Sequence, residues 1–181
     1  MATVPQPYSY PVASIPGGTF TASMSDHLLA MIASLIPSGV NPVINSDSVN
    51  VTIGFDQDLT DTALAVLDGL ILRASEVLVV TLGSGLPLSG GQIAQLNANG
   101  IDTQLMLVQL KNGDGTNSNG HGETINLRTS ALLPVNVRTG NLDILGQFAF
   151  ILQSSHAKGD VQVDVVGQYS IPTVTFFAQW N

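Results

Sequence analysis

The chain has 181 residues, of which 44% are hydrophobic, 10% are charged and none is cysteine, and its formal net charge is −8. This length is enough for one domain with a substantial core, and the lack of cysteine excludes disulfides, thiol nucleophiles and cysteine-bound zinc. The five Lys and Arg residues are scattered, so we expect neither direct nucleic-acid binding nor attachment to anionic membranes. A hydrophobic chain with few charges is expected to fold. Its composition slightly favours burial in an assembly over an isolated polar domain.

Residues 1–18 predict an extended N-terminal arm, because their prolines fix φ and remove backbone donors. The same residues lack the basic start and apolar run of a secretory signal. No uncharged apolar run in the chain approaches the roughly 20 residues that a membrane span needs. We therefore expect a soluble chain or a subunit of a soluble assembly, with residues 19–181 forming a single domain.

Hydrophobic spacing predicts the elements of the first hundred residues. They are a helix at 26–36, a strand at 49–55, a helix or an apolar strand at 60–72, a strand at 76–82 and a short helix at 89–100. Ser25 or Asp26 can cap the first helix, and Thr60 can cap the second segment if it is helical. Gly69 weakens the helical alternative at 60–72.

From residue 101 onward the pattern is that of successive strands separated by glycine-rich turns. The predicted strands are 102–110, 123–129, 134–138, 142–153, 160–169 and 171–180. Regular short strands of this kind predict a mainly β chain, a single antiparallel jelly-roll β-barrel or sandwich with one or two short helices. Trp180, the only tryptophan, is expected to close the core.

No catalytic motif emerges from the sequence. Ser84 lies in TLGSGLP, where the nucleophile elbow would need a glycine at the position of Leu82. His27, His121 and His156 could in principle act as a base, but nothing in the pattern pairs them with a nucleophile. There is no P-loop and no G-x-G-x-x-G. We expect no enzyme activity and no cofactor.

Two acidic patterns are candidate metal sites. Asp56 and Asp58 follow the strand at 49–55, where solvated strand-end acids are the preferred interpretation. The loop NGDGTNSNGHGE at 112–123 places Asp114 and Glu123 at ligand positions of an EF-hand register, but Asn117 stands where that register needs glycine. Glycine and asparagine also favour tight reversals. We therefore expect no metal and predict a long hairpin loop between the flanking strands.

A nearly uncharged all-β chain without cysteine, with a proline-rich arm and a C-terminal closing strand, resembles single jelly-roll viral capsid proteins. It is most similar in pattern to the smaller major capsid protein of icosahedral internal-membrane viruses of haloarchaea and their thermophilic bacteriophage relatives. The resemblance implies a structural virion protein without catalytic residues or a small-molecule substrate. It would pack side by side into capsomers, with itself and with a second, larger capsid protein, near an internal viral membrane.

A second function class stays open beside the capsid interpretation. A jelly-roll carbohydrate-binding module could use the loop at 112–123 as a calcium-assisted or hydrogen-bonding site. Sugar sites usually add exposed aromatic side chains, and none lies near this loop. An enzyme ranks third, because no catalytic constellation supports it.

Overall fold

The computed structural model describes residues 7–36, 41–83, 93–129 and 138–181. In these residues the chain forms eleven β-strands, two α-helices and one short 3-10 helix, which confirms the expected mainly β chain with one or two short helices. By their contacts the residues gather into two compact units. The first is Met1–Glu76 with Asn112–Thr116, and the second is Val77–Lys111 with Asn117–Asn181. The single domain over 19–181 stays a prediction.

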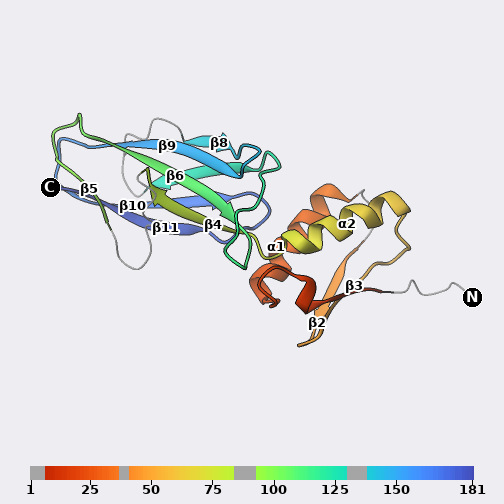
Figure 1. Ribbon diagram of the computed structural model, residues 1–181. Helices are drawn as coiled ribbons and strands as arrows, with labels where there is room; N and C mark the ends of the chain where they lie inside the picture. Colours follow the sequence, from red (N-terminus) through yellow and green to blue (C-terminus); the bar gives the residue numbers. More distant parts are fainter. Residues whose placement is uncertain (1–6, 37–40, 84–92, 130–137) are drawn as a thin grey trace, which may run out of the picture. The chain divides into compact units, whose positions relative to one another are not determined.

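The first unit is a small antiparallel sheet with two helices (Figure 1). Its strands are β1 (Tyr8–Pro11), β2 (Val43–Ser46) and β3 (Asn50–Gly54), in the order β1-β3-β2. Its helices are α1 (Ala22–Leu35) and α2 (Asp61–Arg73), and the 3-10 helix η1 (Val12–Ser14) follows β1. Val51 and Ile53 of β3 are fully buried with Leu28 and Met31 of α1 and Leu67 of α2. Burial of these aliphatic side chains stabilises the unit.

Threonine side chains begin both helices. Thr21 accepts a hydrogen bond from the backbone N–H of Met24, so α1 starts before the predicted caps at Ser25 and Asp26. Thr60 accepts from the N–H of Ala63, which confirms the helical alternative for 60–72 and its predicted cap. Neither helix of the described chain is long and apolar enough to cross a membrane.

The expected extended arm contains a paired strand. β1 pairs with β3 in antiparallel register, with Tyr8 opposite Ile53 and Tyr10 opposite Val51. The prolines are compatible with this pairing because β1 is an edge strand of the sheet. The sequence did not predict β2, because the polar residues Asn45 and Ser46 interrupt its apolar pattern.

The second unit is a β-sandwich (Figure 1). One sheet has the order β4-β6-β9 and the other the order β5-β11-β10-β7-β8. The strands are β4 (Val77–Leu82), β5 (Ile93–Leu96), β6 (Thr103–Lys111), β7 (Thr124–Thr129), β8 (Thr139–Asn141), β9 (Gln147–Gln153), β10 (Gly159–Gly167) and β11 (Val174–Trp180). Alternate side chains of both sheets meet in one core. In this core Phe150 is stacked on Phe148 at a ring-centroid distance of 6.2 Å and tilted against Phe176 at 6.4 Å.

Most strands of the sandwich were expected, two regions differ, and one predicted strand cannot be compared. The short helix predicted at 89–100 is wrong where the chain is described, because β5 pairs in parallel with β11. The strand predicted at 142–153 begins only at Gln147, after a turn. The strand predicted at 134–138 lies almost entirely outside the described residues. Trp180 is buried in the core as predicted.

The strand order of the sandwich is immunoglobulin-like. Sandwiches of that type place strands A, B and E in one sheet and G, F and C in the other. Here β4, β6 and β9 form the first set, and β11, β10 and β7 form the second, extended by β5 and β8. This order does not confirm the expected jelly roll. Alternation in the sequence determines which residues face the core, but it leaves open which strands become neighbours.

Candidate functional site

The four carboxylates considered as metal ligands are divided between the two units. Asp114 belongs to the first unit and Glu123 to the second. Asp56 accepts hydrogen bonds from the backbone N–H and the side-chain amide of Asn41 at 3.2 and 2.6 Å, and Asp58 is exposed. Among the residues that the structure describes, no group of three His, Asp or Glu side chains could hold a metal ion.

The loop at 112–123 is not the hairpin loop that the sequence predicted. The strands on its two sides, β6 and β7, belong to different sheets. Asp114 accepts from the N–H and the hydroxyl of Thr116 at 2.9 and 2.6 Å, and these bonds lower the pKa of its carboxyl. Glu123 is buried and accepts from the N–H of His121 at 2.7 Å. Both carboxylates therefore organise turns of the loop.

The histidines considered as bases are also divided between the two units. His27 lies in the first unit, whereas His121 and His156 lie in the second. Ser84 is outside the described residues. His27 is buried, with its Nε2 3.8 Å from Oε2 of the buried Glu76, and Arg73 lies 3.2 Å from the same oxygen. This cluster joins α1, the last residue of α2 and the segment that follows it. It is a buried ion network rather than an exposed reactive site.

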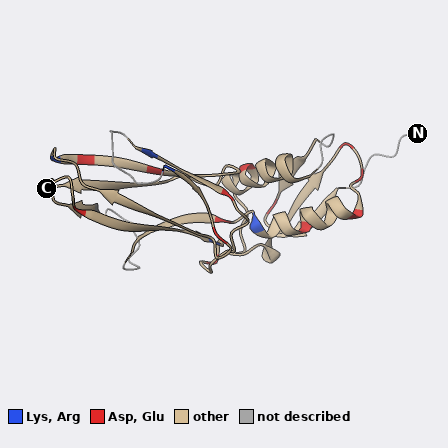
Figure 2. Cartoon of the chain, turned by 90° about the horizontal axis from the view of Figure 1, so that it is seen from above, with Lys and Arg blue, Asp and Glu red and all other residues tan. Residues whose placement is uncertain are grey.

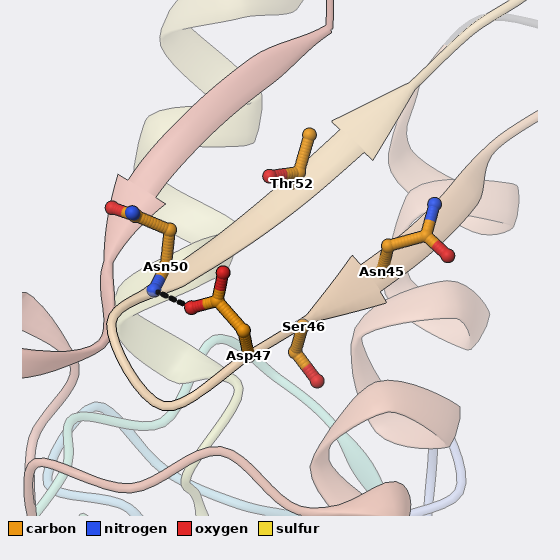
Figure 3. A pocket seen from close by; sticks show the side chains of 5 residues that line it. All are labelled: Asn45, Ser46, Asp47, Asn50 and Thr52. Carbon is orange, nitrogen blue, oxygen red and sulfur yellow. Dashed lines mark hydrogen bonds between the residues drawn. The ribbon is translucent and has the colours of Figure 1, made fainter.

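A shallow polar pocket of about 140 Å³ lies on the β2–β3 hairpin (Figure 3). Its lining residues are Asn45, Ser46, Asp47, Asn50 and Thr52. Asp47 Oδ1 accepts from the backbone N–H groups of Asn50 and Val49, each at 2.7 Å, and these bonds lower the pKa of Asp47. One carboxylate with amides and hydroxyls is a set of hydrogen-bonding groups suited to a polyol more than to an ion.

The most distinctive surface is the outward side of the three-stranded sheet β4-β6-β9 of the second unit. It is here named the outer face. It consists of Val77, Val79 and Thr81 of β4, Thr103, Leu105, Leu107, Gln109 and Lys111 of β6, and Gln147, Ala149, Ile151 and Gln153 of β9. None of these residues is acidic, and Lys111 at one end carries the only charge. Figure 2 shows how much of the chain is uncharged.

Aliphatic side chains form the centre of the outer face. Leu105 lies opposite Ile151 across the β6–β9 pair, and Leu107 lies opposite Ala149. Leu105 is 50% exposed and Ile151 37% exposed. The outward side of the five-stranded sheet differs, because β10 places the acidic Asp164 there. Asp164 accepts hydrogen bonds from Gln162 and Thr175, and these bonds lower the pKa of its carboxyl. An exposed apolar sheet face of this kind is a candidate surface for contact with another molecule.

A turn continues the outer face at the start of β9. The turn spans residues 143–146 and is followed directly by Gln147, the first outward residue of β9. Gln109, which lies opposite Gln147, donates its side-chain amide to the carbonyl of Leu145 at 3.0 Å. Ile144 and Leu145 are 82% and 58% exposed. The predicted strand at 142–153 included this turn, although Asp143 and Gly146 on either side of two aliphatic residues are the signal of a turn.

Comparisons of the chain with known proteins give likenesses to solved structures. No family model and no curated protein matches it. Among solved structures, the D00–D0 domain of intimin matches 98% of this chain and 85% of that chain at 10% identity and a TM-score of 0.41. A family 2 glycosyl hydrolase from Bacteroides cellulosilyticus matches 80% of this chain but 18% of its own, at 9% identity and a TM-score of 0.48.

A third similar structure is SSP-19, an MSP-domain-like protein of Caenorhabditis elegans. It matches 49% of this chain and 94% of its own length, at 11% identity and a TM-score of 0.39. We draw no functional conclusion from likenesses at this level.

Proposed function

We propose that the chain is a structural protein that assembles with other subunits through the outer face, and that the assembly is a virion shell. The observation that carries the proposal is an acid-free, aliphatic sheet face on a chain whose net charge is −8. Interfaces are depleted of charged residues at their centres, because desolvating a charge is unfavourable. The outer face has this composition.

Charge also favours a second copy of the chain as the partner. Two molecules with a net charge of −8 repel each other wherever their carboxylates meet. Two outer faces bring no carboxylate together, and they bury aliphatic surface on both molecules. A basic partner, by contrast, would be attracted to the acidic residues elsewhere on the chain.

The size of the outer face predicts a weak contact. Three strands about 4.8 Å apart and about 3.4 Å per residue, over the length of β9, give roughly 350 Å² on each molecule. Two such faces bury roughly 700 Å² in total, less than the roughly 1,200 Å² of the smallest stable interfaces. A subunit with several neighbours in a shell gains avidity from many such contacts.

The virion is the assembly that the sequence resemblance implies. It supplies the partners as well, namely other copies and a second, larger capsid protein. Because the strand order is immunoglobulin-like, the upright jelly-roll capsomer is not part of the proposal. What we retain is a non-catalytic subunit that packs beside its neighbours.

Sedimentation equilibrium from about 10 μM to about 1 mM tests the outer face, because this range covers weak dimers. We expect reversible self-association that ammonium sulfate strengthens and that Leu105→Asp abolishes. Phe177→Asp is the matched control, since Phe177 is 48% exposed on the five-stranded sheet. Circular dichroism verifies that both variants fold. A wild-type chain that stays monomeric throughout would refute the proposal, as would association that Phe177→Asp abolishes and Leu105→Asp leaves intact.

The hairpin pocket supports a second candidate function, binding of a neutral carbohydrate. Asn45, Asn50 and Thr52 present amides and a hydroxyl that match the hydroxyl groups of a sugar (Figure 3). A glycan array followed by calorimetry tests this candidate. Binding should disappear in Asn45→Ala and persist in Asn126→Ala, on a strand of the other unit. An array without reproducible hits would eliminate it.

A further inference from the structure

We propose that the turn at residues 143–146 is a preorganised apolar anchor, which places Leu145 against Leu105 and Ile151 of a second copy of the chain. The proposal rests on the function proposed above and names the contact that orients the two outer faces. It follows from how the turn is held, what it exposes and where it lies relative to the outer face.

Hydrogen bonds hold the turn from within. Asp143 Oδ1 accepts from the backbone N–H groups of Leu145 and Gln147 at 2.8 and 2.9 Å. The N–H of Gly146 donates to the carbonyl of Asp143 at 2.9 Å, and that of Asp143 donates to the carbonyl of Gln147 at 2.9 Å. The carboxylate of Asp143 is thus directed at backbone donors of its own turn. The side chains of Ile144 and Leu145, here named the tip of the turn, are therefore the groups available to a partner.

The sandwich holds the turn from the other side. The buried Gln109 donates its amide to the carbonyls of Leu145 and Gly146 at 3.0 and 3.3 Å, and it accepts from the amide of Gln147 at 2.9 Å. Gly146 has φ +70°, and a Cβ there would clash with the carbonyl oxygen of Ser118. This close approach requires glycine. The turn therefore keeps one conformation without a partner, which lowers the entropic cost of binding.

The exposure of the tip indicates binding. Turns usually carry polar residues or glycine at their central positions, whereas Ile144 and Leu145 are 82% and 58% exposed. Two large aliphatic side chains on a rigid turn gain free energy only when another surface covers them. The fold does not cover them in the described structure.

The position of the turn selects the partner surface. Leu145 lies beyond Gln109 and Gln147 at one end of the outer face, while Leu105 and Ile151 lie toward the other end. Two outer faces can pack about a two-fold axis that lies in the plane of their contact and runs perpendicular to the strands. This axis places each end of one face over the opposite end of the other. In that arrangement each Leu145 covers the most exposed aliphatic pair of the partner, and both contacts form at once. No acidic residue of either outer face enters the contact.

Engineered cysteines test the arrangement directly, because the chain contains no cysteine of its own. A short bis-maleimide is added to Leu145→Cys, Leu105→Cys and Ala149→Cys, each alone, and to an equal mixture of the first two with one chain carrying a mass tag. We expect a crosslinked heterodimer in the mixture and little product from Leu145→Cys or Leu105→Cys alone. Ala149→Cys, near the centre of the face, should crosslink with itself.

The outcomes separate this inference from the proposed function. If Ala149→Cys crosslinks and the mixture does not, the outer face assembles but the turn is not its anchor. If no variant crosslinks and the wild-type chain is monomeric, both proposals fail. Leu145→Asp should weaken self-association by about tenfold or more, with an unchanged thermal unfolding midpoint. Flotation of the wild-type chain with phosphatidylcholine vesicles, lost in Leu145→Asp and without crosslinking, would overturn the inference in favour of a lipid surface.

Discussion

The hydroxyl of Tyr10 on β1 donates a 2.8 Å hydrogen bond to Oδ1 of Asp68 on α2. The neighbouring Tyr8 uses its hydroxyl to accept from the N–H of Leu59, at 3.0 Å, just before the same helix. β1 is therefore joined to α2 by side chains as well as to β3 by backbone pairing. These two tyrosines make residues 8–11 an integral part of the first unit.

The environment of the Tyr10 hydroxyl predicts that the folded chain loses stability at high pH. Burial, and then the hydrogen bond to Asp68 and its negative charge, raise the pKa of Tyr10 above its ordinary value. A raised folded-state pKa contributes stability below about pH 10, and this stability is lost as the pH rises through the folded value. Denaturant unfolding at about pH 7 and about pH 11 should therefore show a smaller decline in Tyr10→Phe than in the wild type. At neutral pH the variant should lose about 1 kcal/mol with the hydrogen bond. Tyr169→Phe, in the second unit, is the control, and an equal decline in all three proteins would contradict the prediction.

Asp47 predicts an acid-sensitive hairpin. Hydrogen bonds from the backbone N–H groups of Asn50 and Val49 lower the pKa of its carboxyl. A lowered pKa contributes stability above the ordinary value of about 3.9, and this stability is lost as the pH falls through the folded value. The amide protons of Val49 and Asn50 should shift together in an NMR titration below about pH 4. The shift should be absent in Asp47→Ala, and a titration that is the same in this variant would show that another group causes it.

Local patterns in the sequence predicted those elements that local chemistry determines. The alternation of Val161, Val163 and Val165 with polar residues indicated β10, and all three valines are buried. Thr60 followed by spaced aliphatic residues left a helix and a strand open at 60–72, and the structure has the helix α2 there. The four candidate metal ligands were identified from spacing and residue type alone. The search for catalytic motifs also used only spacing and residue type, so both could be done on the sequence.

Non-local pairing decided what the sequence could not show. β5 is a strand because residues some 84 positions later, as in the pair Gln95 and Gln179, lie beside it. The outer face was also hidden, because leucines that alternate with buried residues look the same whether another element covers them or not. The anchor turn was merged into a strand, since Ile144 and Leu145 have the apolar character expected of one.

Two glycines of the first unit predict opposite effects of the same substitution. A Cβ on Gly113 would lie 2.6 Å from the carbonyl oxygen of Pro16 and 2.9 Å from Cβ of Ser75. Gly113→Ala should therefore destabilise the unit by about 1–3 kcal/mol, the usual cost of overpacking. Gly69 lies inside α2, and a Cβ added there would meet no atom within 4 Å beyond the helix's own backbone, so Gly69→Ala should stabilise by about 0.5–1 kcal/mol. Thermal unfolding of both variants checks the signs, and a neutral Gly113→Ala would show that the segment at 112–116 yields easily.

The buried ion network predicts non-additive substitutions. Glu76 accepts from Arg73 Nε at 3.2 and 3.3 Å, and its side chain is fully buried. Glu76→Ala should cost about 3–5 kcal/mol, because it removes the anion that faces Arg73 and His27. The double variant Arg73→Met/Glu76→Leu should cost less than Glu76→Ala alone, since no uncompensated charge remains from the pair. Urea unfolding of Arg73→Met, Glu76→Leu and the double variant forms the double-mutant cycle. Additive costs would mean that the two residues act independently.

The hydrogen bonds of the Gln109 amide predict that the stability of the sandwich and the self-association of the chain are linked. Its amide donates to the carbonyls of Leu110 and Leu145 at 2.9 and 3.0 Å, and the side chain is buried. Gln109→Met keeps the volume but removes the donor, so unfolding should become easier by about 1–3 kcal/mol. Amide hydrogen exchange at Leu145 should become faster, because the turn loses its support. Gln104→Met is the matched control, since Gln104 donates to the carbonyl of the neighbouring Leu105 and is half-buried. If Gln109→Met loosens the turn, self-association should weaken although Leu145 itself is unchanged; unaltered association would show that the anchor needs no preorganisation.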